Sequence, residues 1–172
     1  FKPSEETPRG AAELAEIFIA AGVPPGVFNV IQGDGAVGAW LTQHPDIAKI
    51  SFTGEVSTGS KVMAAASATL KDLTMELGGK SPNIFFESVM AQDDSFLDKA
   101  IEGLVLFAFN QGEVCTCPSR ALVQESIYGD FMERVLARAK QIKQGNPLDT
   151  ETMVGAQVSR EQFDRIMGYM EV

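Results

Sequence analysis

Two cysteines, Cys115 and Cys117, lie in a segment bounded by glycine and proline that follows an apolar helical pattern. A thiol in such a loop differs from a core cysteine, which would lie on the apolar face of a helix or strand. Reactive residues concentrate in loops on a rigid scaffold. Backbone N–H groups in this loop would favour the thiolate and stabilise an oxyanion. From the residues alone, a nucleophilic cysteine and an incidental cysteine pair both remain open.

A carboxylate, Glu76, ends an apolar strand pattern and precedes Gly78 and Gly79. Ligands of α/β sheets bind outside the carboxyl ends of the strands. A carboxylate that is partly desolvated there can act as a general base near neutral pH. The alternative is an ordinary surface glutamate at a strand end.

Two glycine-rich turns could hold a nucleotide. The first, over residues 33–38, satisfies G-x-G-x-x-G between a predicted strand and a predicted helix, and Glu55 follows about 20 residues later. The second, over residues 52–59, joins a strand to a helix start, where free N–H groups and the helix dipole bind phosphate. The Glu55 carboxylate would repel a pyrophosphate there unless it points away. The alternatives are a tight turn in the first case and a helix cap by Glu55 and Ser57 in the second.

Composition excludes several classes of function. The single histidine, His44, lies in a turn before Pro45, so histidine-based hydrolysis and a Cys2His2 zinc site lack their imidazoles, and no metal site is predicted. The net charge of −9 disfavours nucleic acid as a partner. No apolar run reaches the ~18 residues that a membrane span needs. Cysteines this close in sequence rarely form a disulfide, which indicates a reducing compartment and a cytoplasmic location.

The elements that must position these residues alternate between helical and strand patterns, which predicts an α/β fold. The Gly78-Gly79 pair is the natural boundary between two parts, residues 1–78 and residues 79–172. Both ends of the chain look cut, so we expect an internal segment of a longer protein. Predicted helices cover residues 8–21, 36–43, 57–70, 98–109 (apolar almost all round, hence buried) and 126–143 (capped by Ser126), and predicted strands cover 27–31, 48–53, 73–77, 83–86 and 120–124.

Five motifs occur here in an order and at separations that resemble those of the aldehyde dehydrogenase superfamily. The resemblance covers essentially all 172 residues and corresponds to about a middle third of a family member. The motifs are Lys2-Pro3-Ser4-Glu5 with Thr7-Pro8, Pro24-Pro25-Gly26-Val27-Phe28-Asn29-Val30, Ile50-Ser51-Phe52-Thr53-Gly54, Glu76-Leu77-Gly78-Gly79-Lys80-Ser81-Pro82 and Asn110-Gln111-Gly112-Glu113-Val114-Cys115.

The resemblance implies roles at the matching positions. Cys115 would be the nucleophile, with Cys117 a spare thiol, and Glu76 would be the base that activates the deacylating water. Residues 1–78 would be part of an NAD(P)-binding domain with a Rossmann-like sheet, and residues 79–172 part of an α/β catalytic domain. The implied cofactor contacts are Lys2 and Glu5 on the adenosine ribose, Gly33 and Gly35 on the adenine side, and Phe52, Gly54, Glu55, Leu77 and Gly78 around the pyrophosphate turn and the strand end.

This placement means that the G-x-G-x-x-G match misleads about where the phosphates bind. Two departures from the family are Glu55, where many members carry serine, and the segment around residues 89–96, which looks longer than usual and should be a surface insertion. The implied partners are a small aldehyde and, for the complete protein, a second copy in a homodimer or further copies in a homotetramer.

The implied reaction is oxidation of an aldehyde to the carboxylic acid with reduction of NAD or NADP, through a thiohemiacetal and a thioester on Cys115. Glu5 would repel a 2′-phosphate, which slightly favours NAD. Phe109, Val114 and Thr116 suggest an aliphatic or small aldehyde, and residues 1–172 alone would be inactive. Three alternatives remain. One is a coenzyme-A-acylating semialdehyde dehydrogenase, which tends to lack the glutamate at position 76, and another is a non-catalytic nucleotide-binding relative. The third is a hydrolase of activated esters, which leaves Lys2 and Glu5 unexplained.

Overall fold

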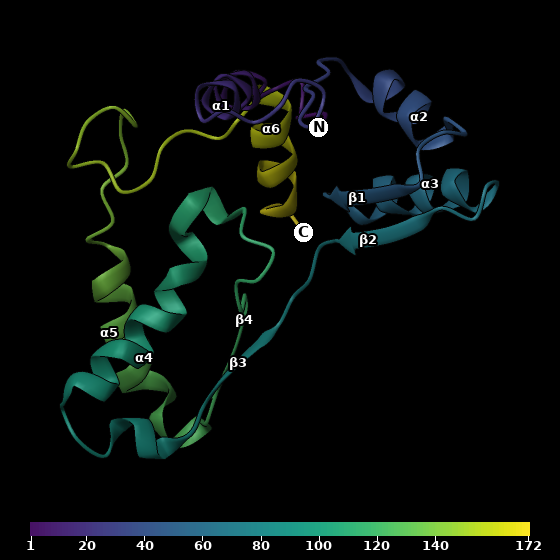
Figure 1. Ribbon diagram of the computed structural model, residues 1–172. Helices are drawn as coiled ribbons and strands as arrows, with labels where there is room; N and C mark the ends of the chain where they lie inside the picture. Colours follow the sequence, from purple (N-terminus) through teal and green to yellow (C-terminus); the bar gives the residue numbers. More distant parts are fainter. The chain divides into compact units, whose positions relative to one another are not determined.

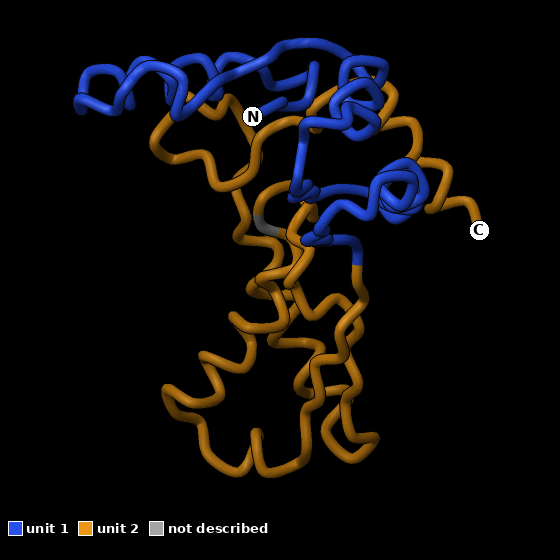
Figure 2. The backbone as a smooth tube through the Cα atoms, turned by 45° about the vertical axis from the view of Figure 1, so that its right-hand side comes forward, with its two compact units in different colours: residues 1–78 blue, residues 79–172 orange. Residues whose placement is uncertain are grey.

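The chain forms two compact units, residues 1–78 and residues 79–172 (Figure 2). This computed structural model describes residues 1–172 except Phe109. Within the described residues, each unit combines helices with a pair of parallel strands (Figure 1). The α/β fold class is therefore confirmed. None of the described helices is long and apolar enough to cross a membrane.

In the first unit, strands β1 and β2 pair in parallel. Helix α3 connects them along the chain, which makes a β-α-β unit. Their register pairs Lys49 with Asp72 at one end and Thr53 with Glu76 at the other. The carboxyl ends of both strands therefore lie side by side, where α/β sheets bind ligands. The elements of this unit are α1 (Arg9–Ala20), α2 (Gly35–Gln43), β1 (Lys49–Thr53), α3 (Val56–Ser67) and β2 (Asp72–Glu76).

Residue types explain how this strand pair forms. Alternate residues of each strand are half-buried, as the pleat requires, and helix α3 packs against the pair with Val62 and Ala66 buried. At the amino ends of the strands, the Lys49 ammonium lies 2.9 Å from the Asp72 carboxylate. The hydrogen bond and the charge of Lys49 hold the pKa of Asp72 below its ordinary value.

Residues 27–31 do not form the predicted strand. The amino group of Phe1 donates to the Asn29 carbonyl at 2.6 Å, and the Ile31 N–H donates to the Phe1 carbonyl at 2.9 Å. These two bonds follow the parallel pattern, but in the part of the chain that the structure describes, Phe1 alone makes them and no strand forms. A strand prediction needs a partner strand, and local sequence does not report one.

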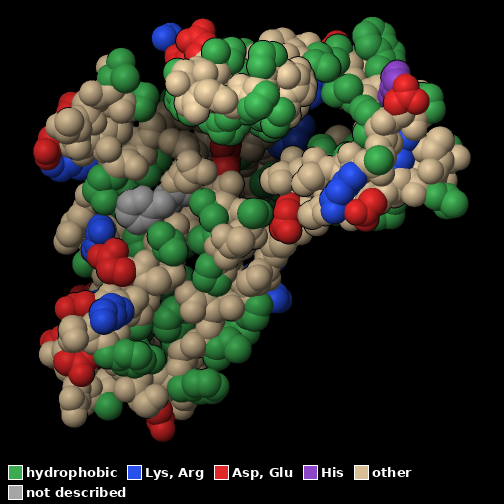
Figure 3. Space-filling view, viewed as in Figure 1, with side chains coloured by type: hydrophobic (Ala, Val, Ile, Leu, Met, Phe, Trp, Pro, Cys, Tyr) green, Lys and Arg blue, Asp and Glu red, His purple; other side chains and the backbone are tan. Residues whose placement is uncertain are grey.

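Helix α1 confirms the helix predicted over residues 8–21, but several of its apolar side chains are exposed. Its N-cap is Pro8, without a side-chain cap. Leu14 and Ile17 are 38% and 60% exposed, and Figure 3 shows hydrophobic side chains gathered over α1 at the top of the view. The ring of Phe18 instead packs edge-on against Phe28, with 4.6 Å between the ring centroids.

In the second unit, strands β3 and β4 pair in parallel, from Pro82 with Arg120 to Phe85 with Val123. The chain between them contains helix α4, so this unit repeats the strand-helix-strand order. The elements are β3 (Pro82–Phe85), η1 (Glu87–Met90), α4 (Ser95–Val105), η2 (Leu106–Gly112), β4 (Arg120–Val123), η3 (Glu125–Ile127), α5 (Tyr128–Ala139) and α6 (Arg160–Tyr169).

Helices α4 and α5 pack together and supply most of the core of this unit. The rings of Phe85 and Phe131 lie 4.8 Å apart between centroids, and Phe131 is completely buried. The predicted helix over residues 98–109 ends at Val105 and continues as a 3-10 segment in which Leu106 and Phe107 are about half exposed, so the prediction of a helix buried on all sides is wrong there. The buried cluster consists of Phe85, Leu97, Ile101, Leu104, Val105, Ile127, Phe131 and Val135.

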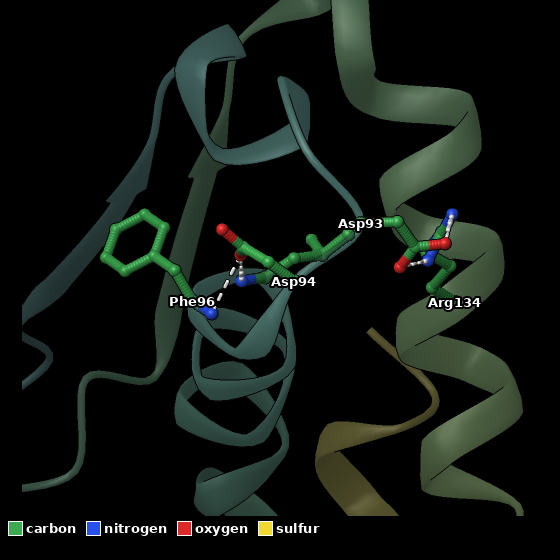
Figure 4. Close-up of polar contacts among 5 residues, drawn as sticks. Asp93, Asp94, Phe96 and Arg134 are labelled. Carbon is green, nitrogen blue, oxygen red and sulfur yellow. Dashed lines mark hydrogen bonds and ion pairs between the residues drawn. The ribbon is translucent and has the colours of Figure 1, made fainter.

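The segment before α4 lies at the surface and is tied to α5 (Figure 4). Asp94 caps α4, because its carboxylate accepts from the N–H groups of Phe96 and Leu97 at 2.9 and 3.2 Å. Asp93 accepts two hydrogen bonds from Arg134 of α5, at 2.8 and 3.1 Å (Figure 4). This hydrogen-bonded guanidinium lowers the pKa of Asp93, and Asp93 in turn raises the pKa of Arg134.

Ser126 does not cap α5, contrary to the sequence prediction. The helix begins at Tyr128 after the short 3-10 segment η3, and its N-cap position carries no side-chain hydrogen bond. The Ser126 hydroxyl donates instead to the Glu87 carboxylate at 3.2 Å, which also accepts from the Gln124 amide at 3.0 Å. These contacts fasten the end of β4 to the end of β3.

Candidate active site

The carboxyl ends of β1 and β2 bring several predicted cofactor residues together. The Gly54 N–H donates to the Glu76 carbonyl at 3.0 Å, which joins the two strand ends. A Cβ added at Gly54 would lie 2.6 Å from the Phe52 ring, and one added at Gly59 would lie 2.6 Å from Leu77. The absence of a side chain at Gly54 and Gly59 therefore lets Phe52 and Leu77 pack closely against the first turns of α3.

Helix α3 begins with an open first turn. Glu55 occupies the N-cap position, but its carboxylate accepts from the Ser57 hydroxyl at 2.9 Å and from no backbone N–H of the helix. Among the described residues, the N–H groups of Val56, Ser57 and Thr58 have no hydrogen-bond partner. Free N–H groups at a helix start bind anions. These N–H groups are therefore available to a phosphate group, but the Glu55 carboxylate stays in the same turn on Ser57, and its negative charge opposes an anion there as that of Asp34 does at α2.

The G-x-G-x-x-G turn has a different local geometry. The Asp34 carboxylate caps α2 by accepting from the Ala36 N–H at 2.9 Å, and its negative charge disfavours an anion there. Gly33 has a φ of 145°, and an added Cβ would lie 2.4 Å from a methyl group of Val37. By contrast, Gly35 faces open space. The backbone conformation and the contact with Val37 thus explain why position 33 is a glycine.

Lys2 lies beside the first turns of α2, and Glu5 pairs with it. The Lys2 ammonium is 3.8 Å from the Glu5 carboxylate and donates to the Pro3 carbonyl at 2.7 Å. The Lys2 stem lies 3.7 Å from the position of a Cβ at Gly38, so it rests on the helix. The lysine side chain is mostly buried and the glutamate is exposed. The structure therefore brings both predicted ribose contacts to one place.

The two thiols of the second unit differ in accessibility. Cys115 lies in the loop after η2 and is exposed, whereas Cys117 is buried, and both are free thiols. The Cys117 N–H donates to the Val114 carbonyl at 3.2 Å, while the N–H of Cys115 has no partner among the described residues. A Cβ added at Gly79 would lie 3.8 Å from the Cys115 carbonyl oxygen. Of the two thiols, Cys115 is therefore the one that a substrate could reach, and its nucleophilic role remains a prediction.

Glu76 is exposed at the end of β2, so the described residues of the first unit do not desolvate it. Of the predicted substrate contacts, Val114 and Thr116 are exposed beside Cys115, and Phe109 lies outside the described residues. His44 is an exposed turn residue whose ring nitrogen accepts from the Asp46 N–H at 3.2 Å. In the part of the chain that the structure describes, no cluster of histidine, cysteine or carboxylate side chains could hold a metal ion.

Sequence reasoning missed one contact of the cysteine loop. The Gln157 amide donates to the Gln111 carbonyl at 3.2 Å, across 46 residues of sequence. Gln157 stands between α5 and α6 in a segment without a periodic pattern. Because the contact is long-range, no local signal in the sequence points to it.

Comparison with known proteins gives a consistent family. The aldehyde dehydrogenase family matches residues 1–172. Acetaldehyde dehydrogenase 2 from Cupriavidus necator is 57% identical over 172 residues, which are 99% of this chain and 34% of that protein. Among solved structures, the aldehyde dehydrogenase KauB from Pseudomonas aeruginosa has a TM-score of 0.91 at 43% identity, and it matches over 99% of this chain and 34% of its own.

A double mutant of betaine aldehyde dehydrogenase from Staphylococcus aureus, in complex with NAD+, has a TM-score of 0.88 at 36% identity, over 99% of this chain and 33% of its own. The chain therefore spans about a third of the length of the relatives that it matches.

Proposed function

The chain belongs to the aldehyde dehydrogenase family, and we propose that the complete protein that carries it oxidises an aldehyde to the carboxylic acid with NAD or NADP as oxidant. The observation that carries this proposal is the contrast between the two thiols. Cys115 is exposed in an irregular loop, with its own N–H available, while Cys117 two residues later is buried. A substrate could therefore reach the thiol of Cys115 but not that of Cys117.

The first unit has features that suit a dinucleotide, and we propose residues 1–78 as part of the cofactor-binding domain. The open start of α3 after Gly54 and Glu55 would receive the pyrophosphate. Lys2 and Glu5 would bind the ribose hydroxyls, and the Glu5 carboxylate favours NAD because it would repel a 2′-phosphate. The complex of the related betaine aldehyde dehydrogenase with NAD+ supports a nicotinamide dinucleotide in this unit, and the preference for NAD over NADP rests on Glu5 alone.

The remaining cofactor contacts in this proposal are Gly33, Gly35, Phe52, Leu77 and Gly78, at the start of α2 and the ends of the two strands. When bound, the cofactor accepts the two electrons and the hydrogen that leave the substrate carbon.

In the proposed reaction, the thiolate of Cys115 attacks the aldehyde carbon and forms a carbon–sulfur bond. The carbonyl oxygen becomes an oxyanion, which the Cys115 N–H stabilises. Loss of hydride from that carbon converts the thiohemiacetal to a thioester. Glu76 removes a proton from water, the hydroxide attacks the thioester, and the carbon–sulfur bond breaks to release the acid and the thiolate. Residues 79–172 would supply part of the catalytic domain.

We propose a small aldehyde as substrate. Val114 and Thr116 flank Cys115 with modest side chains, and the relative from Cupriavidus necator is named an acetaldehyde dehydrogenase. A homodimeric or homotetrameric assembly rests on the family resemblance alone, and the proposed cytoplasmic location rests on the two free thiols, which suit a reducing compartment. Because the chain spans about a third of its relatives, we expect residues 1–172 by themselves to be inactive.

The proposal is tested by mixing the complete protein with acetaldehyde and either NAD or NADP, and by following the absorbance of the reduced nicotinamide. The Cys115→Ala variant should lose turnover, whereas Cys117→Ala, the matched control, should keep it. Turnover that survives in Cys115→Ala would show that the nucleophile lies elsewhere. If the wild type reduced neither cofactor with any aldehyde, the reading as a non-catalytic nucleotide-binding relative would replace the enzyme.

A further inference from the structure

The turn that precedes the nucleophile loop has an unusual backbone. Asn110, Gln111 and Gly112 follow one another with φ values of 50°, 57° and 77°. The left-handed region costs little for glycine, but side chains such as that of glutamine rarely adopt it. Such conformations persist when surrounding contacts hold them, and they are concentrated at functional sites. The contacts that hold this turn therefore bear on the position of Cys115.

Those contacts come from residues 155–157. The Gln157 Nε2 group donates to the Gln111 carbonyl at 3.2 Å. In the amide orientation that satisfies both of its polar atoms, the Gln111 side chain accepts from the Gly155 N–H and donates to the Asn110 carbonyl, each at 3.1 Å. The same Asn110 carbonyl accepts from the Glu113 N–H at 3.0 Å. Residues 155–157 thus bind both the backbone carbonyl and the side chain of Gln111.

The segment that makes these contacts is joined to the core of the second unit. Val154 is buried, its N–H donates to the Lys143 carbonyl at 3.1 Å, and its carbonyl accepts from the Gly145 N–H at 3.1 Å. Residues 143–145 follow α5, which packs against α4, and α4 leads directly into η2 and the turn. The turn therefore has two supports. On one side it follows α4 and η2, and on the other it contacts residues 155–157, which are joined through Val154 to the end of α5.

Gln157 carries a feature that stability alone does not explain. Its Oε1 atom is buried and has no hydrogen-bond partner among the described residues. Leaving a buried acceptor unpaired is unfavourable, and an apolar side chain of similar size would fill the space without that cost. The bond from Nε2 to the Gln111 carbonyl is therefore the described contact that distinguishes this amide from an apolar side chain at position 157.

We propose that Gln157 is a positioning residue for the thiol of Cys115. Through its bond to Gln111, it keeps the turn over residues 110–112 left-handed, and the turn sets where the loop presents Cys115. This inference rests on the proposed function only in taking Cys115 as the nucleophile.

The test uses the Gln157→Met variant of the complete protein, which keeps the length of the side chain and removes the amide. Gln92→Met is the matched control, because Gln92 is exposed before α4 and makes no side-chain hydrogen bond with the described residues. Two quantities are measured: the rate of the first burst of reduced nicotinamide with acetaldehyde, and the ratio of Cys115 to Cys117 alkylation by iodoacetamide, read by mass spectrometry.

Gln157→Met should slow the burst about 10- to 100-fold, because a shift of about 1 Å in a reacting group has this effect. It should also lower the alkylation ratio, with the thermal midpoint close to that of Gln92→Met. Alkylation needs neither aldehyde nor cofactor, so a lowered ratio supports the inference even if no aldehyde is oxidised. A ratio equal to that of Gln92→Met, with an equal burst wherever a burst exists, would overturn it.

A second variant covers the case in which Gln157→Met does not fold. A Cβ at Gly155 would lie 3.3 Å from the Gln111 side-chain atom that accepts from the Gly155 N–H in this amide orientation. Gly155→Ala therefore disturbs the contact with the Gln111 side chain and leaves Gln157 unchanged. A lowered alkylation ratio in folded Gly155→Ala protein supports the positioning role. A ratio equal to that of the wild type contradicts it.

Discussion

Replacing Gly33 by alanine should loosen the start of helix α2. The φ of 145° at Gly33 is one that side chains rarely adopt, which costs ~1–3 kcal/mol. The added Cβ would also lie 2.4 Å from a methyl group of Val37, and overpacking of this kind costs ~1–3 kcal/mol. Together these terms amount to roughly 2–6 kcal/mol. Even the lower value corresponds to about 30-fold faster local opening, since 1.4 kcal/mol is a factor of ten.

Hydrogen exchange read by mass spectrometry measures this opening in peptides that cover residues 33–43 of the complete protein. Gly35→Ala is the control within the same motif, because its Cβ would face open space and it should leave exchange unchanged or slower. Val37→Ala should rescue part of the Gly33→Ala effect, with a coupling of at least about 1 kcal/mol, because it removes the clash but not the strained φ. Equal exchange in Gly33→Ala and Gly35→Ala would refute a backbone role for the first glycine.

Three further changes have defined outcomes. Phe131→Ala should destabilise the second unit by ~3–5 kcal/mol in urea unfolding, because the ring is completely buried, whereas exposed Tyr128→Ala should change little; a small effect at Phe131 would mean that the core lies elsewhere. The contribution of Asp93 depends on pH: since Arg134 lowers the folded pKa of Asp93, the stabilisation is complete above about pH 4 and is lost as the pH falls through the folded value. The unfolding midpoints of wild type and Asp93→Asn should therefore converge below about pH 4, and a gap that widened there would contradict the pairing. Lys2→Met keeps the stem of Lys2 but removes its ammonium, and should raise the Kd for NAD about tenfold or more in calorimetry; an unchanged Kd would remove Lys2 from the cofactor site.

Local sequence signals predicted most helices and strands, because the pleat and the helical period are local properties. The predicted strand over residues 48–53 and helix over 57–70 agree with β1 and α3 to within a few residues. The prediction failed where a distant partner decides the outcome. Among the described residues, 27–31 bond along their length with Phe1 and with no second strand, and the Ser126 hydroxyl binds Glu87, 39 residues away, instead of capping its own helix.

The candidate site divides in the same way. Residue types and spacing singled out Cys115 and Glu76, and these assignments remain proposals. Sequence could not report that Glu55 would bond Ser57 and leave the N–H groups of α3 open, because a cap residue has several possible partners. Nor could it report the left-handed backbone at Gln111, since that conformation depends on contacts with residues more than 40 positions away.

The covalent mechanism is tested by pre-steady-state kinetics of Glu76→Gln in the complete protein, with acetaldehyde and NAD. The amide keeps the size of the side chain but cannot take a proton from water. We predict steady turnover in the wild type, and in Glu76→Gln a single burst of reduced nicotinamide near one equivalent per site, followed by a stall with the acyl group on Cys115. Wild-type turnover in Glu76→Gln would contradict the assignment of Glu76 as the base and would favour the coenzyme-A-acylating alternative.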